Sequence, residues 1–366
     1  MSETAADLCD NILPRVPMRQ WVLSLPVPAR YWMSKNPKLI TEVLTIINRV
    51  IHGYYKKKSR IATPLTGAVT FIQRFGGSLN LNIHFHILYI DGVFAQQNDK
   101  LEFHPVPKPT QDEILTTVTR IASRLNRLFM RKGLVDEDDT ELGVNEQIMG
   151  ASVRNLSLIE GHKQLGKEKT IEPNASVTSR LCVAHLGYSL HAAVHVQATE
   201  RSRLESLIRY VARTSLPLSR MREIQNGRIE LKLKKPWSDG TTAVYFTPMQ
   251  LIERLVALVP KPRAHLTRFH GVLAPHSKLR SQVVPQRSVD TDVKPSTCPT
   301  RRLGWAKLLA RIFDIHMEKC VCGKTVKFIA SVEDPKVIKK ILTHVALPTQ
   351  APTFSPARAP PQTELF

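Results

Sequence analysis

The centre of this chain is built around one stretch, Val69-Thr-Phe-Ile-Gln-Arg-Phe-Gly-Gly-Ser-Leu-Asn-Leu-Asn-Ile-His-Phe-His-Ile-Leu-Tyr-Ile90. Two apolar runs, 69–73 and 79–90, are separated by five residues whose two glycines supply the backbone freedom of a tight turn. The pattern predicts a β-hairpin. Because side chains alternate along a strand, His84 and His86 then share one face, while Phe85 points to the other face, towards a core.

The paired histidines have two interpretations. Two imidazoles side by side on a strand are a ready pair of metal ligands. Alternatively, they line the polar face of an edge strand, and the local pattern does not separate these readings. Two other motifs are excluded by Leu88-Tyr89, because a histidine-triad nucleotide hydrolase would have a third histidine at position 88 and a metallo-β-lactamase would have Asp-His at 88–89.

Strand and helix patterns alternate on both sides of the hairpin. Residues 21–26 form a short β-type run, and apolar residues recur at helical spacing over 38–55. The capping-box pattern Thr110-Gln-Asp-Glu113 starts another helix, which stops near Gly133. Further predicted helices cover 199–213, 248–259, 305–313 and 335–345, and an acidic run at 136–141 is typical of a solvated loop.

A second β-type segment, 181–196, alternates throughout its length. We predict one continuous strand, with an apolar face that includes Tyr188, Leu190 and Val194. The opposite face carries three histidines, namely His185, His191 and His195.

The composition favours a polyanionic partner. The 366 residues include 52 Lys and Arg against 31 Asp and Glu, a formal net charge of +21, and such an excess is typical of nucleic-acid binding. The N-terminus lacks the basic and apolar regions of a secretory signal, and no apolar run is long enough to span a membrane. Five scattered cysteines do not suggest a disulfide framework. We therefore expect a cytoplasmic protein without a membrane partner.

Tyr210 is the second residue that could carry chemistry. On the predicted helix 199–213 it lies at the shoulder of the apolar stripe, and the segment 199–235 holds ten Lys or Arg against four Glu. One interpretation is a boundary tyrosine that packs its ring and exposes its hydroxyl. The other is a nucleophile, because a phenol can attack a phosphodiester when a divalent ion polarises the phosphate.

With these features the sequence resembles the rolling-circle transposases of the IS-ninety-one and ISCR (common-region) insertion elements. They belong to the HUH endonuclease class, named for its His-hydrophobic-His motif. The likeness covers most of the chain in separated blocks that keep one order: Arg15-Val-Pro-Met-Arg-Gln-Trp-Val-Leu-Ser-Leu-Pro26, Gln73-Arg-Phe-Gly-Gly-Ser-Leu-Asn-Leu-Asn-Ile-His-Phe-His86, Asp91-Gly-Val93, Tyr188-Ser-Leu-His-Ala-Ala193, Arg209-Tyr210, Leu258-Val-Pro260 and Arg268-Phe-His-Gly-Val-Leu-Ala-Pro275.

The resemblance implies an α+β fold, with an HUH-endonuclease-like central antiparallel sheet, flanking helices and a smaller helical C-terminal region. It also implies a bacterial, nucleoid-associated and metal-dependent transposase that nicks one DNA strand, holds its 5′ end on a tyrosine and rejoins it elsewhere. His84 and His86 then become ligands of Mg²⁺ or Mn²⁺, and Tyr210 becomes the nucleophile. HUH sites use a third polar ligand, for which we choose His191. The two-tyrosine subgroup carries another tyrosine one helical turn later, where this chain has Thr214.

The expected substrate is single-stranded DNA at the element's termini, bound by basic segments at 54–60, 199–235 and 261–280. The cations expected on the strand are Lys56, Lys57, Lys58, Arg74, Arg209, Arg213 and Arg268. We predict a catalytic domain over 15–260, a basic proline-rich segment over 261–300, a small α-rich region over 301–348 and a disordered tail over 349–366.

Two departures from the family pattern bear on these expectations. Full-length members begin with a cysteine-rich zinc module, whereas residues 1–14 contain only Cys9, so we expect that module to be absent or truncated. Near the C-terminus, Cys320-Val-Cys322 shortens a Cys-x-x-Cys knuckle to a spacing that suits zinc poorly, and reduced structural cysteines are the expected reading.

Two alternative functions stay open at this point. The chain could be a catalytically inactive, truncated DNA-binding remnant of such a transposase, which would bind DNA in a salt-sensitive manner without forming a covalent adduct. It could also be a plasmid replication initiator or a relaxase with the same chemistry. The DNA beside the gene separates these cases, because insertion-element ends and a replication or transfer origin are different sequence contexts.

Overall fold

A computed structural model describes residues 1–98, 100–134, 144–157, 163–164, 176–179, 181–216, 218–237, 239–285, 303–320, 322–327, 329 and 332–349. The chain divides into two compact units, one formed by residues 8–288 and the other by residues 1–7 with 289–366. The predicted acidic loop at 136–141, the segment around Cys298 and residues 350–366 of the predicted tail lie outside the described residues.

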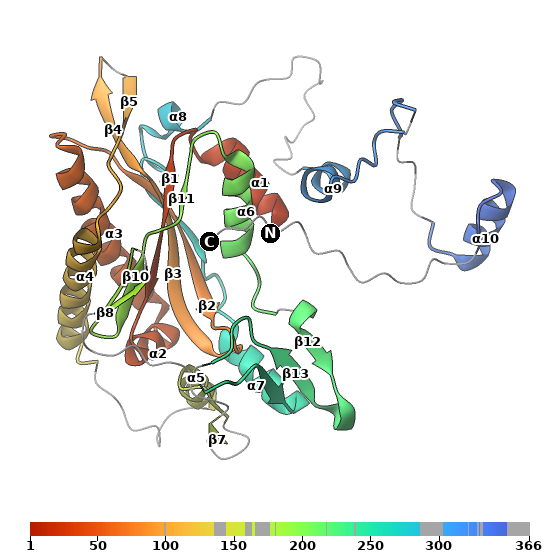
Figure 1. Cartoon of the computed structure of the whole chain (residues 1–366), viewed down its shortest axis with the longest axis horizontal. Helices are drawn as coiled ribbons and strands as arrows, with labels where there is room; N and C mark the ends of the chain where they lie inside the picture. The colour runs from red at the N-terminus through yellow and green to blue at the C-terminus, as the bar shows by residue number, and fades with distance from the viewer. Residues whose placement is uncertain are drawn as a thin grey trace. The chain divides into compact units, whose positions relative to one another are not determined.

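The larger unit is organised around an antiparallel sheet (Figure 1). Its strands are β1 (Met18–Ser24), β2 (Gly67–Phe75), β3 (Leu81–Ile90), β8 (Ser176–Ser179), β9 (Cys182–His185), β10 (Tyr188–His191), β11 (His195–Val196) and β15 (Thr267–Gly271). They lie in the order β15-β2-β3-β1-β10-β9-β8, and β11 also pairs with β1. The predicted α+β class is confirmed, and β3 is a central strand, which removes the edge-strand reading of its histidines.

Helices cover both faces of this sheet. Figure 1 shows α3 (Pro37–Ser59) and α4 (Gln111–Arg131) on one side and α6 (Arg201–Val211) on the other. The alternate residues Ile83, Phe85 and Ile87 of β3 join α3 and α4 in one hydrophobic core. His84 and His86, between them, therefore face the α6 side.

The remaining helices and strands lie between these elements in the chain or belong to the smaller unit. They are α1 (Ser2–Asp7), a π-helical turn (Leu8–Ile12), α2 (Val27–Lys35), β4 (Gly92–Gln97), β5 (Lys100–Pro105), α5 (Val144–Val153), β6 (Leu156–Ser157), β7 (Lys163–Gln164), a 3₁₀ turn (Leu218–Arg220), β12 (Met221–Glu223), a second 3₁₀ turn (Gln225–Gly227), β13 (Ile229–Lys232), β14 (Ala243–Phe246), α7 (Pro248–Leu258), α8 (Arg280–Val283), α9 (Trp305–Phe313) and α10 (Pro335–His344). Across the described residues, no helix is long and apolar enough to span a membrane.

Local sequence signals set the ends of the helices as expected. The Thr110 hydroxyl accepts a hydrogen bond from the Glu113 amide, and the Glu113 carboxylate accepts one from the Thr110 amide at 2.8 Å, which confirms the capping box of α4. Residues 267–271, inside the predicted proline-rich segment, form β15 and complete one edge of the main sheet.

The prediction of one continuous strand over 181–196 is wrong. The chain reverses at Leu186 and Gly187, which both have positive φ (51° and 76°), and β9 then pairs with β10. Because directly paired residues share a face, His185 lies with Tyr188, and His195 lies with Arg19, on the core side. Of the three histidines, only His191 shares the face of His84 and His86.

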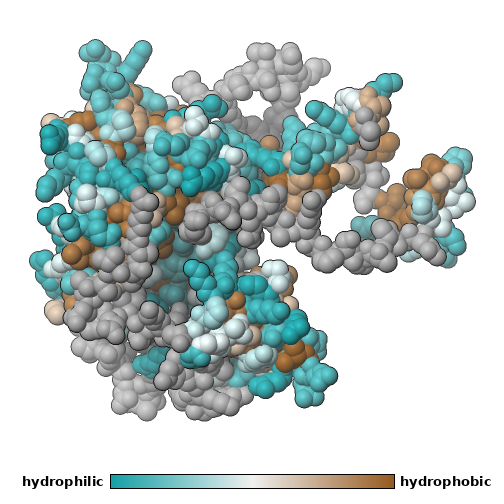
Figure 2. All heavy atoms as spheres, in the orientation of Figure 1, coloured by the Kyte–Doolittle hydropathy of each residue, from teal (hydrophilic) through white to brown (hydrophobic). Residues whose placement is uncertain are grey.

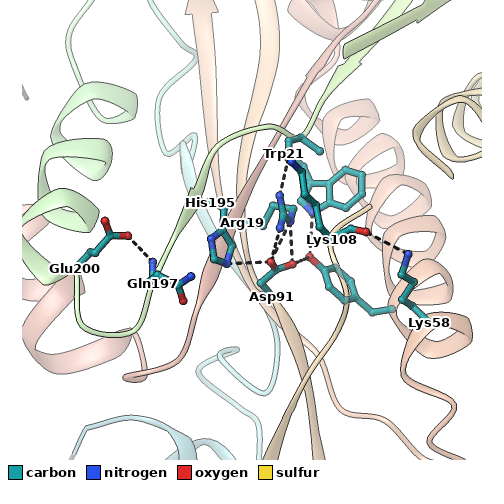
Figure 3. A network of polar contacts seen from close by, with 10 residues as sticks. Arg19, Trp21, Lys58, Asp91, Lys108, His195, Gln197 and Glu200 are labelled. Carbon is teal, nitrogen blue, oxygen red and sulfur yellow. Dashed lines mark hydrogen bonds and ion pairs between the residues drawn. The ribbon is translucent and has the colours of Figure 1, made fainter. Parts of the chain in front are cut away.

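A buried polar cluster fixes the end of the sheet that leads to His191 (Figure 3). The Arg19 guanidinium donates to both oxygens of Asp91, with an Nη2–Oδ2 distance of 2.7 Å, and its Nη1 donates to the Ala192 carbonyl. The hydroxyl of Tyr55 and the ring of His195 also contact Asp91, at 3.1 and 3.2 Å. Arg19 of β1 therefore links Asp91, which follows β3, to Ala192, which follows β10. Losing either Arg19 or Asp91 would leave a buried charge unpaired.

Candidate active site

The histidine pair of β3 lies in the buried half of the α6 face. The two rings are 5.0 Å apart between centroids. The Nδ1–H of His84 donates to the Asn82 carbonyl at 2.8 Å, and Nδ1 of His86 lies 2.8 Å from the Gln20 amide nitrogen. An Nδ1–H held by a carbonyl leaves Nε2 of His84 with a free lone pair, which is the form that binds a metal.

Both imidazoles are held neutral. Burial lowers the pKa of His84 to about 4, against the smaller opposing effect of its bond to Asn82. Burial also lowers the pKa of His86 well below its ordinary value, and the charges of His84, Arg213 and His191 lower it further. Neutral imidazoles at physiological pH can donate lone pairs rather than repel a cation: His84 offers Nε2, whereas His86 offers Nε2 only when the Gln20 amide turns its oxygen, in place of its nitrogen, to Nδ1.

Strand register places further polar groups beside this pair. Gln73 of β2 lies directly opposite His84. His86 lies opposite Val22 of β1, and Val22 in turn lies opposite His191 of β10. His191 is thus on the same face as the pair but two strands from His86, about 9–10 Å away along the sheet.

Asn82, on the same face of β3 as His84, has a buried Oδ1 without a hydrogen-bond partner among the described residues, and Gln73 is a second such group. Its side chain is buried, and its Nε2 donates to the carbonyl of Val211 at 2.6 Å. Within the described part of the chain, its Oε1 is buried without a hydrogen-bond partner. A buried amide oxygen left unsatisfied costs free energy, so this atom is available to a ligand beside His84.

Tyr210 reaches the histidines because α6 is tied at both ends. At its start, Arg201 donates to the carbonyls of Cys9, Leu13 and Pro14, and at its end the Val211 carbonyl accepts from Gln73. The apolar residues of α6 are buried, and the ring of Tyr210 meets the ring of His86 edge-on, with centroids 6.5 Å apart and planes at 86°.

The cations expected on DNA fall into separate places. Arg213 stacks on Tyr210, with its guanidinium carbon 4.5 Å from the ring centroid, and Arg209 lies on the same helix, paired with Glu205 at 3.7 Å. These two of the predicted residues are the ones that the structure brings to Tyr210.

The other predicted DNA-binding cations lie elsewhere. Lys58, at the end of α3 beside Lys56 and Lys57, pairs with Glu113 of α4, and Arg268 donates to Thr41 of α3. Both positions belong to the opposite face of the sheet. Arg74 is buried and donates to the carbonyls of Leu258 and Ala257, so its guanidinium caps the C-terminus of α7.

The residues present fit a divalent ion at β3. No group of three or more His, Cys, Asp or Glu among the described residues is placed to share an ion. Two imidazoles and the unsatisfied Oε1 of Gln73 nevertheless form a mixed nitrogen–oxygen donor set. An amide oxygen can bind a divalent ion although glutamine is not one of those four residue types. The pair Cys320 and Cys322 is exposed, and it joins no such group.

Comparison with known proteins now bears on this geometry. The model of the Y2 transposase family (Y2_Tnp), described as "Putative transposase", matches residues 67–281. The chain belongs to this transposase family. The matched stretch contains β2, β3, α6 and the strands β12–β14, and therefore His84, His86 and Tyr210 of this transposase. No curated protein and no solved structure matches the chain.

Sequence reasoning missed Gln73, because its place in the sheet depends on where the hairpin closes and on a β-bulge, neither of which has a local sequence signal. The sequence predicts a turn over 74–78, but the amide of Gly76 donates to the carbonyl of Asn80, so the hairpin closes two residues later. A Cβ on Gly76 would lie 2.1 Å from Oδ1 of Asn80, which explains the glycine. This closure alone would set Gln73 opposite Ile83, and the β-bulge between Gln73 and Phe75 shifts it by one residue, opposite His84. Gln20 carried no comparable local signal.

Proposed function

We propose that this transposase nicks and rejoins single-stranded DNA through a covalent 5′-phosphotyrosine on Tyr210, as in rolling-circle transposition. The contact between the Tyr210 and His86 rings carries the proposal, because it sets a phenol beside two neutral imidazoles that share one face of β3. The stack of Arg213 on the same ring adds a cation where a phosphodiester would lie.

The step is a transesterification that conserves the number of phosphodiester bonds. The Tyr210 oxygen forms a bond to phosphorus, the bond from phosphorus to the 3′ oxygen breaks, and the phenol proton is balanced by the proton that the new 3′ hydroxyl takes up. A second 3′ hydroxyl attacks the phosphotyrosine to rejoin the strand and returns the proton to the phenol. With Thr214 in the place of a second tyrosine, one nucleophile serves each protomer.

His84 and His86 would hold a Mg²⁺ or Mn²⁺ ion, which would draw charge from the phosphate oxygens. For the third ligand, the structure offers two candidates. Gln73 is favoured, since its oxygen is buried, lacks a partner among the described residues and lies directly opposite His84. His191 is the rival, on the same face but across β1.

The experiment uses single-stranded oligonucleotides that tile the DNA on both sides of the gene and carry a label at the 3′ end. The 3′ fragment stays on the protein if Tyr210 takes the 5′ phosphate, so a labelled, denaturation-resistant band is expected with Mn²⁺. Tyr210→Phe should abolish this band, at least a thousandfold below the wild type, because the nucleophile is removed while the ring is kept.

Tyr245→Phe is the matched control, because Tyr245 is an exposed tyrosine on β14 that donates to Glu230. It should form the adduct at the wild-type level. An adduct that survives in Tyr210→Phe would overturn the assignment. Salt-sensitive binding of the same oligonucleotides without any adduct would instead support the DNA-binding remnant.

A further inference from the structure

The small sheet β12–β14 follows α6 and carries two cations towards Tyr210. The ladder of β13 and β14 extends by a bond from the Leu233 amide to the Thr242 carbonyl, and this extension fixes Lys234 just beyond β13. The Lys234 ammonium lies 5.0 Å from the centroid of the Tyr210 ring. Arg220 ends the 3₁₀ turn before β12, where its Nη1 donates to the Lys232 carbonyl at 2.8 Å.

Arg213, Arg220 and Lys234 gather closely enough to repel one another. Burial lowers the pKa of Lys234, and the charges of Arg213 and Arg220 lower it further. Burial and the charge of Arg213 act on Arg220 in the same way. Arg213 also covers the rings of Phe75 and Tyr210, at 5.6 and 4.5 Å, so its guanidinium plane is held in place.

No anion balances these cations in the part of the chain that the structure describes. None of the three forms an ion pair there, although neighbouring arginines do: Arg209 pairs with Glu205, and Arg222 pairs with Glu230. The Nε of Arg213 is moreover buried without a hydrogen-bond partner among the described residues. Hydrophilic side chains predominate over β12 and β13 in Figure 2.

Three converging cations with an unsatisfied donor are unfavourable unless an anion joins them. We propose that Arg213, Arg220 and Lys234 form a phosphate-binding site for the single DNA strand held against Tyr210. Planar guanidinium groups bind phosphate oxygens with two parallel hydrogen bonds, and the ammonium adds a point charge. The site rests on the proposed function for its ligand, a phosphodiester adjacent to the one attacked.

The test measures binding in the Tyr210→Phe protein, so that no chemistry intervenes. The probe is a labelled 20-nucleotide single strand, and its Kd is followed against NaCl concentration. Each phosphate contact contributes about 0.7 to the slope of log affinity against log salt. Lys234→Gln should therefore lower the slope by about 0.7 and the triple glutamine variant by about 2, with a clear loss of affinity near physiological salt.

Lys132→Gln is the matched control, since this exposed lysine ends α4, on the face of the sheet opposite α6 and outside the basic segments expected on DNA. It should change the Kd less than about twofold. In a second assay, one phosphate of the strand at a time is replaced by a neutral methylphosphonate. At the linkage that Lys234 contacts, the replacement itself weakens binding, so Lys234→Gln should cause no further loss of affinity there. Circular dichroism and thermal melts establish that each variant is folded, and Lys234→Glu, which reverses the charge, gives a second measure at the same position.

The proposal is overturned if the triple variant keeps the wild-type slope, or if Lys132→Gln weakens binding as much as Lys234→Gln does. The outcome is separable from that of the nicking proposal. If no Tyr210 adduct forms, a smaller salt dependence of binding in the triple variant still supports the phosphate site. With a Tyr210 adduct and an unchanged slope, the phosphate site fails while the nucleophile stands.

Discussion

The two faces of β3 are made by alternate residues of one strand, yet they are built differently. Leu81, Ile83 and Phe85 have no exposed surface and pack against α3 and α4 in a continuous apolar core. On the other face, His84 and His86 lie among buried polar groups, and their neighbour Gln73 keeps an oxygen without a partner among the described residues.

The difference shows how one strand separates stability from chemistry. Close-packed apolar side chains hold β3 rigidly in place, because each fills its space and leaves no room to shift. The polar face then gains fixed positions for groups that would not by themselves fold the chain. Changes on the first face should therefore alter the free energy of unfolding, and changes on the second should alter ligand binding.

The largest expected effect is on the core face. Phe85→Ala should lower the free energy of unfolding by about 3–5 kcal/mol, because it removes a fully buried ring and leaves a cavity between the sheet and its helices. Urea titration followed by circular dichroism measures the change. His86→Ala, one residue along, should cost less than half as much in the same titration. Equal losses from the two variants would contradict the division between the faces.

The next effect belongs to the polar face. In the Tyr210→Phe background, Gln73→Leu should weaken Mn²⁺ binding about 10–100-fold by titration calorimetry, since it removes the unsatisfied oxygen beside His84. Gln73→Glu should retain Mn²⁺ binding because it supplies a carboxylate oxygen, although it loses the hydrogen bond that Gln73 donates to the Val211 carbonyl. Recovery with Glu separates a ligand from a residue that only positions α6.

His191→Ala is the comparison that decides between the two candidate ligands. If Gln73 supplies the third ligand, His191→Ala should change the Mn²⁺ affinity less than about threefold. A larger loss in His191→Ala than in Gln73→Leu would assign the ion to His84, His86 and His191 instead. Loss in neither variant would refute both candidates and leave Oδ1 of Asn82 as the remaining unsatisfied donor on that face of β3.

Local patterns predicted much of this arrangement, and the failures have physical causes. The periodicity of apolar residues predicted the bounds of β3, α3 and α4 to within a few residues, because the apolar side chains of each element face one hydrophobic core. It failed over 181–196, where Leu186 continues the apolar alternation although its backbone turns with positive φ. Gln73 and Lys234 escaped notice because strand register and the β13–β14 ladder, neither visible locally, place them in the site.

The smallest effect tests the core face by pH. His270 of β15 lies on that face, where its Nε2 is 2.9 Å from the Thr70 hydroxyl, and burial lowers its pKa to about 4. The unfolded chain, with an ordinary pKa of 6.5, binds this proton first, so the folded state loses stability as pH falls from 6.5 towards 4. Between pH 7 and 5.5 the loss from this one group is about 1 kcal/mol. His270→Gln should remove that part of the slope in urea titrations at the two pH values, while His84 and His86 keep theirs. His276→Gln, at an exposed position, should leave the slope unchanged. If His270→Gln leaves the wild-type slope intact, the core face is open enough to water at β15 for His270 to be protonated in the folded protein.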